Sequence, residues 1–102
     1  MGKMWDERDT KALLSEVAVL ARAGADVTAM LRAIQQHLGT RRCSIEAISL
    51  LRRVFDLPLY DLLSIGGWIG FESGNPGPDD AELELRFGAG LRSSIKPEFE
   101  SD

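Results

Sequence analysis

Apolar residues return every three or four positions through most of the first 65 residues, and this spacing constrains the fold more than any other feature. The clearest stripe consists of Val27, Met30, Leu31, Ile34 and Leu38. Residues at this spacing fall on one side of an α-helix. The pattern predicts helices over residues 10–23, 27–38 and 45–55, and a shorter helix from Leu59 to the Gly66-Gly67 pair.

The ends of these segments carry residues that start or stop helices. Asp26 and Ser44 belong to the types whose side chains accept the free N–H groups of a first turn. Gly24 and Gly39 follow the predicted helices, and glycine readily takes the left-handed conformation that ends many helices. Pro58 cannot continue the third helix but suits the start of a fourth. The boundaries and the apolar spacing therefore agree.

The stretch from Gly66 to Pro78 breaks the helical pattern. Seven of its residues are Gly or Pro, and Trp68, Ile69 and Phe71 lie between them. Such a composition is typical of a loop held in place by aromatic side chains. A short β element over residues 68–71 is the alternative.

Residues 79–95 fit two patterns. Apolar and charged residues alternate from 82 to 87, which is the pattern of a β element there. Leu83, Phe87 and Leu91 also fit one side of a helix, and Asp79 follows a proline as at many helix starts. We favour the helix.

Together these patterns predict a mostly α fold, a compact bundle of four to five short helices. The length of 102 residues suits a single helical domain. Its ends, about 1–8 and 97–102, are expected to be frayed.

Cysteine usage and hydropathy bear on the compartment. Cys43 is the only cysteine, so an internal disulfide is excluded and a reducing cytoplasm is favoured. The N-terminus lacks the apolar run of a signal peptide. No stretch approaches the roughly 18 apolar residues of a membrane span, so we expect no membrane partner.

Few residues here belong to types that carry out chemistry. His37 and Cys43 form the only Cys/His combination, with no third group to orient them. One histidine and one cysteine are too few for a typical zinc site, and the adjacent Asp79 and Asp80 should diverge. The glycines of 66–77 match no nucleotide-binding pattern. We expect no enzyme, no metal, no cofactor and no small-molecule ligand.

Charge is divided unevenly along the chain. Residues 1–55 hold nine basic and six acidic residues, a net charge of +3, whereas residues 56–102 hold three and ten, a net charge of −7. An acidic half favours association with a basic protein, and aromatic side chains commonly anchor protein interfaces. The predicted partner-binding residues are Tyr60, Asp61, Trp68, Phe71, Glu72, Asp79, Asp80, Glu82 and Glu84.

An alternative is a small regulator that resembles helix-turn-helix proteins. Its phosphate contacts would come from Arg41, Arg42, Arg52 and Arg53. Glu46, near the start of the third helix, would be repelled by phosphate. The net charge of −4 also disfavours nucleic acid as the partner.

Residues 44–63 resemble part of the C-terminal domain of the bacterial ribosomal stalk protein. The shared features are the isoleucine-alanine-isoleucine start and the Leu51-Arg52 pair. The glycine of that family is Asp56 here, and its Glu-Ala-Lys triplet is Asp61-Leu62-Leu63. The lysines that contact translation factors are also missing, so that role is not implied.

The same segment, followed by the glycine-tryptophan loop and an acidic final element, is similar to small immunity proteins of contact-dependent growth inhibition and other polymorphic toxin systems. This resemblance covers roughly residues 26–92. It implies a cytoplasmic antidote that binds one cognate bacterial toxin domain, often a nuclease, and blocks its basic active site.

Overall fold

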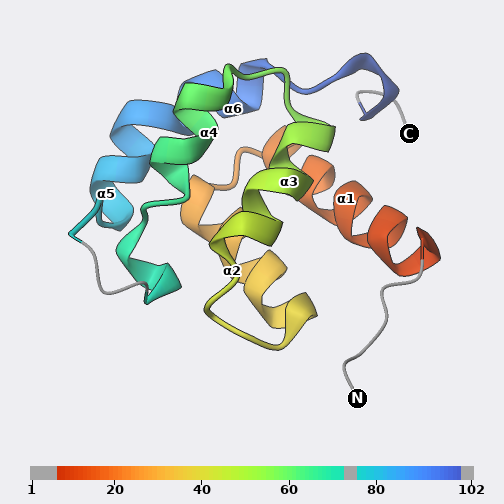
Figure 1. Cartoon of the computed structure of the whole chain (residues 1–102). Helices are drawn as coiled ribbons and strands as arrows, with labels where there is room; N and C mark the ends of the chain where they lie inside the picture. Colours follow the sequence, from red (N-terminus) through yellow and green to blue (C-terminus); the bar gives the residue numbers. More distant parts are fainter. Residues whose placement is uncertain (1–6, 73–75, 100–102) are drawn as a thin grey trace.

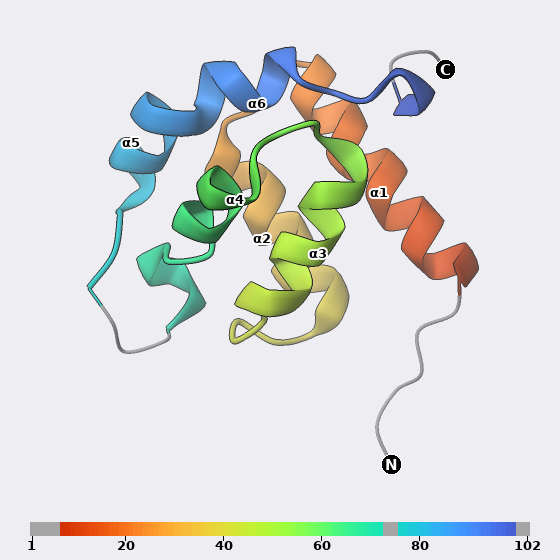
Figure 2. The ribbon, with the colours of Figure 1, turned by 45° about the horizontal axis from the view of Figure 1, so that its top comes forward.

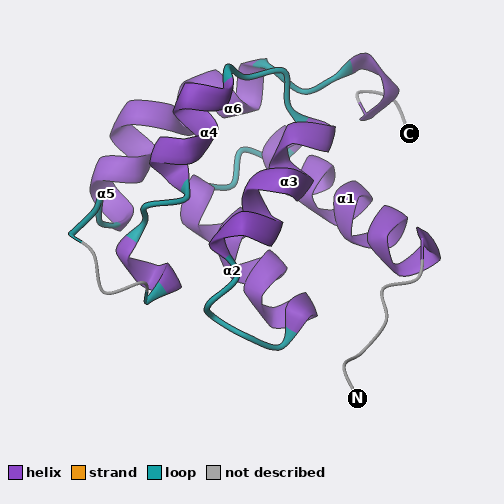
Figure 3. Cartoon of the chain, viewed as in Figure 1, coloured by secondary structure: helices purple, strands orange, loops and turns teal. Residues whose placement is uncertain are grey.

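In the computed structural model, which describes residues 7–72 and 76–99, helices account for all of the named elements. Figure 1 traces the chain and Figure 3 separates its helices from the connecting loops. The elements are α1 (Glu7–Arg22), α2 (Val27–Leu38), α3 (Ser44–Val54), α4 (Leu59–Ile65), the 3-10 turn η1 (Ile69–Phe71), α5 (Asp80–Leu83), the π-helical turn η2 (Glu84–Gly88), α6 (Ala89–Ser93) and the 3-10 turn η3 (Pro97–Phe99).

The predicted all-α fold is confirmed, and α2 has the predicted bounds. Helix α1 begins at Glu7, three residues before the predicted start. Gly24 and Gly39 have φ angles of 84° and 75°, so both adopt the left-handed conformation expected of them. Hydrophobic residues from helices α1 to α6 of the described residues form one buried cluster.

The two cap predictions have different outcomes. Asp26 is the N-cap residue of α2 as predicted, but its side chain makes no capping hydrogen bond; the Val27 backbone N–H donates instead to Glu84 Oε1 over 2.9 Å. The prediction for α3 is wrong by one residue. Cys43 precedes α3, and Ser44 is already its first residue. The start of α2 is therefore supported by a contact from a distant part of the chain, which local sequence does not reveal.

Helix α3 uses a different side for the core than predicted. Ala47, Leu51 and Val54 are buried, whereas Ile45, expected on the core stripe, is 78% exposed. Residues 47, 51 and 54 share one face of a helix, and residue 45 lies well to the side of it. Ile48 is half-buried at the edge between the two faces.

Neither predicted β element is present. Residues 69–71 form η1 and residues 82–87 are helical; in the described part of the chain the only β pairing is an isolated bridge between Phe55 and Ile95. The short apolar run at 68–71 lacks a neighbouring strand, and so its backbone closes a 3-10 turn. The favoured helix over 79–95 is confirmed, although a π-helical turn interrupts it.

That π-helical turn matches the spacing of the apolar residues. Leu83, Phe87 and Leu91 are buried and lie four residues apart. In a regular α-helix each step of four overshoots a full turn by roughly 40°. The wider turn of residues 84–88 offsets this drift, so that all three side chains face the core.

The chain ends differ in part from the expectation of fraying. Residues 1–6 and 100–102 lie outside the described residues, but Glu7 and Arg8 belong to α1. At the other end, η3 is tied back to α1, because Arg22 Nη1 donates to the Phe99 carbonyl over 3.0 Å. No described helix is both long and apolar enough to cross a membrane.

Helix α4 lies beside α3 in both views (Figures 1 and 2), and the two helices are in contact. Both η1 and α5 lie next to α2, because Gly70 accepts from the Gln35 amide and α5 contacts α2. This arrangement brings acidic residues of the second half of the sequence close to basic residues of the first half.

Candidate functional site

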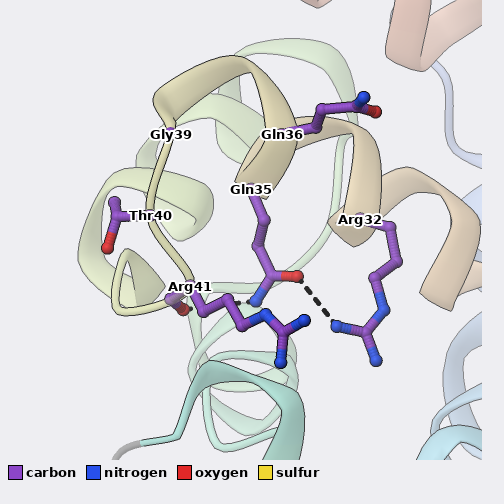
Figure 4. Close-up of a pocket in the computed structure, with 6 residues that line it drawn as sticks. All are labelled: Arg32, Gln35, Gln36, Gly39, Thr40 and Arg41. Carbon is purple, nitrogen blue, oxygen red and sulfur yellow. Dashed lines mark hydrogen bonds between the residues drawn. The ribbon is translucent and has the colours of Figure 1, made fainter.

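Two adjoining hollows lie where the end of α2 meets the returning chain. One, of about 440 Å³, is lined by Arg32, Gln35, Gln36, Gly39, Thr40 and Arg41 (Figure 4). The other, of about 490 Å³, is lined by Arg32, Arg41, Ile69, Gly70, Glu72, Asp79, Asp80 and Ala81. Because both include Arg32 and Arg41, we call the combined feature the Arg32–Arg41 groove.

Gln35 holds the walls of this groove together. Its side chain is 5% exposed, and its Nε2 donates to the carbonyls of Arg41, over 3.2 Å, and Gly70, over 2.9 Å. Its Oε1 accepts from Arg32 Nη1 over 3.2 Å, as Figure 4 shows. One buried amide therefore connects α2, the loop after it and η1. A polar residue beside the apolar stripe of α2 is the signal from which sequence reasoning could have identified it.

Trp68 is part of the core rather than the surface. Its side chain is fully buried and meets Phe71 edge to face, with 5.3 Å between ring centroids. The Arg32 guanidinium lies 4.7 Å from its ring centroid, a stabilising cation–π arrangement. Trp68 Nε1 donates to Asp80 Oδ1 over 2.7 Å.

These contacts decide how Trp68 and Phe71 can serve the predicted interface. Both are at most 1% exposed, so neither reaches a partner while the core stays intact. Their role in the structure is to hold the 68–72 segment against α2.

Three of the predicted acidic residues line the groove. Glu72 pairs with Arg41 over 3.1 Å, and both side chains remain largely exposed. Asp79 caps α5 by accepting from the Glu82 N–H over 2.8 Å. Asp80 accepts from the Trp68 indole. Each carboxylate is thus oriented by a contact within the chain.

Glu82 and Glu84 are absent from the lining of the groove. Glu82 forms an exposed pair with Arg86 over 3.4 Å. Glu84 binds Arg92 Nη2 over 2.6 Å and accepts from the Val27 N–H. The hydrogen bond from Arg92 is the main cause that lowers the Glu84 pKa. Glu84 therefore stabilises the start of α2.

Tyr60 and Asp61 lie on α4, outside the lining of the groove. Tyr60 is 77% exposed, and Asp61 is half-buried. The fold thus divides the nine predicted residues between the groove, α4, the core and the α5–α6 segment.

The groups considered for chemistry are separated or buried. Cys43 is 1% exposed; burial, together with the nearby Glu46 charge, raises its thiol pKa. His37 lines a different hollow with Asp9 and Glu16. Among the described residues no group of three His, Cys, Asp or Glu side chains could hold a metal ion.

The four arginines of the alternative hypothesis are also divided. Arg41 is engaged with Glu72 at the groove, and Arg42 lies on the loop before α3. Arg52 and Arg53 are exposed at the opposite end of α3. This arrangement offers no single basic recognition helix of the kind that enters a DNA groove.

Comparison with known proteins gave no relative: no protein-family model, no curated protein and no solved structure matches this chain.

Proposed function

We propose that this protein is a non-catalytic binding module for a basic protein surface, and that it acts as an immunity protein for a cognate bacterial toxin domain. The observation that carries the proposal is the position of Glu72, Asp79 and Asp80 around one groove. They come from two separate segments of the acidic half of the chain. A basic side chain from the partner would enter between them.

The orientation of these carboxylates supports rapid and specific binding. Glu72, Asp79 and Asp80 each use one contact within the chain, which limits the rotamer freedom that binding would otherwise remove. A carboxylate oxygen accepts more than one hydrogen bond, so each group retains capacity for a guanidinium or ammonium group. Arg32 and Arg41 reduce the repulsion among the three carboxylates. They would also repel a partner that places its own cations directly against them.

The toxin assignment rests on the sequence resemblance, and it is tested by growth. The gene next to that of this protein is expressed in a sensitive bacterial host, with and without this chain. An immunity protein restores growth and forms a complex whose affinity falls steeply with salt. Absence of both protection and binding at low salt would falsify the toxin assignment.

The groove is tested by removing charge without removing shape. In the variant Glu72→Gln, Asp79→Asn, Asp80→Asn, the amide oxygens still accept the internal hydrogen bonds, and Asn remains a good helix cap. We expect binding to the toxin domain to weaken at least about tenfold, mainly through slower association at low salt.

A matched control changes net charge equally elsewhere. Asp9→Asn, Glu16→Gln, Glu46→Gln removes three exposed acids of α1 and α3. Equal weakening in both variants would mean that only the overall charge matters, and that the groove is not the binding site.

A further inference from the structure

Helices α3 and α4 present an apolar surface that the fold leaves uncovered. Ile45 is 78% exposed, Leu59 45% and Leu63 55%, with Tyr60 at the edge of the surface at 77%. Half-buried Ile48 completes it. We call these five residues the α3–α4 face.

One contact shows that Ile48 lies next to the end of α4. Ile48 on α3 fills the space where a side chain at Gly66, directly after α4, would lie. The Ile48 side of α3 therefore faces α4, and Ile45 lies one turn earlier on that side. On α4, Leu59 and Leu63 are four residues apart and share a side.

Helix α4 is apolar on two sides. Leu62 and Ile65 are buried, while Leu59 and Leu63 point elsewhere. The apolar arc of α4 is therefore wider than the part that the core covers, and contiguous exposed apolar residues mark interaction surfaces. Leu59 and Leu63 are the part of this arc that the fold leaves uncovered.

The charges at the edge of this surface identify what covers it. Arg52 lies four residues after Ile48, on the same side of α3, and Asp56 follows in the link to α4; both are exposed. The Arg52 side chain forms no hydrogen bond or ion pair with any other residue that the structure describes. In a two-fold symmetric contact residue i meets residue j and j meets i, so one cation and one anion at the same end of the surface form two identical ion pairs.

We propose that the α3–α4 face binds a second copy of this chain in a two-fold symmetric dimer. With the symmetry axis along the helices, α3 of each copy lies over α4 of the other. Arg52 then meets the link containing Asp56 in the partner copy, and the four helices form a bundle-like layer. The Arg32–Arg41 groove takes no part, so this inference is independent of the proposed function.

Sedimentation equilibrium from micromolar to near-millimolar concentration tests the dimer. We expect the wild type to be a dimer. In Ile45→Glu and Leu63→Glu the dimer contact would bury an unpaired charge, so the dissociation constant should rise at least about a hundredfold and these variants should be monomers. Leu85→Glu is the control, since Leu85 is 86% exposed on the π-helical turn. A monomeric wild type, or equal loss of association in the control, overturns the proposal.

A charge exchange tests the symmetry. Arg52→Asp should weaken the dimer about tenfold, and the double variant Arg52→Asp, Asp56→Arg should recover most of this loss because the pair is restored in reversed order. All substituted side chains are exposed, so far-UV circular dichroism and thermal unfolding should match the wild type. A double variant no tighter than Arg52→Asp alone refutes the two-fold pairing.

Discussion

Replacing Gln35 with methionine tests whether one buried amide holds the groove together. Methionine is also unbranched and of similar length, so the side-chain volume is nearly kept. The substitution removes three hydrogen bonds: one from Arg32 Nη1 and two to the carbonyls of Arg41 and Gly70. The first involves a charged donor, which makes it stronger than a neutral bond.

The expected loss follows from these contacts. A hydrogen bond contributes about 1 kcal/mol net, so the three bonds together contribute about 3 kcal/mol. The apolar gain of methionine offsets roughly 1 kcal/mol of the sum. We therefore expect Gln35→Met to lower the free energy of unfolding by about 2 kcal/mol, which corresponds to a fall in Tm of roughly 10 °C for a chain of this size.

Urea unfolding followed by far-UV circular dichroism measures this loss, and Gln36→Met is the matched control. Gln36 is the next residue of α2 and is exposed, so its replacement should change stability by less than about 0.5 kcal/mol. A Gln35→Met variant as stable as this control would refute the reasoning. It would mean that Arg41 and Gly70 satisfy their carbonyls equally well without the amide.

Three further predictions concern five substitutions. Trp68→Phe removes the indole N–H that donates to Asp80. Because that hydrogen bond has a charged acceptor, the free energy of unfolding in denaturant should fall by more than about 1.5 kcal/mol. Asp80→Asn keeps an accepting oxygen and should lower it less. The folded-state pKa of Glu84 is lowered from its ordinary value of 4.5. The stability that its carboxylate contributes is therefore present above pH 4.5 and is lost as the pH falls through the folded-state pKa. In an acid titration, Glu84→Gln should lose stability less steeply than the wild type. Gly90→Ala, where a side chain meets nothing within 4 Å, should raise Tm because alanine favours helix, whereas Gly77→Ala should lower Tm because its Cβ would collide with the Gly67 carbonyl.

Helices α1–α3 could be predicted because their apolar spacing and their boundaries agree. The segment after Pro78 was ambiguous for a physical reason. Leu83, Leu85 and Phe87 alternate as in a strand, and the choice depends on whether Leu85 finds a core to enter. In the structure Leu85 is 86% exposed, so the alternation of apolar and charged residues does not indicate which of them are buried.

The candidate site was predictable only in part. The acidic character of Glu72, Asp79 and Asp80 is evident from the sequence, but their approach to Arg32 and Arg41 depends on how the chain returns to α2. Local patterns contain no information about such long-range contacts. An aromatic residue in a glycine-rich segment suits a core or an interface equally, and the sequence alone could not decide between them.

The π-helical turn at Glu84–Gly88 has a consequence for how this segment tolerates length changes. A π turn is equivalent to an α-helix that has taken in one additional residue. Leu85 contributes nothing to the core. Deleting it should let the segment form an uninterrupted α-helix in which Leu83 and Leu91 still face the core. The segment can thus shorten by one position without turning its inward side toward solvent, which makes homologues one residue shorter here compatible with the same fold.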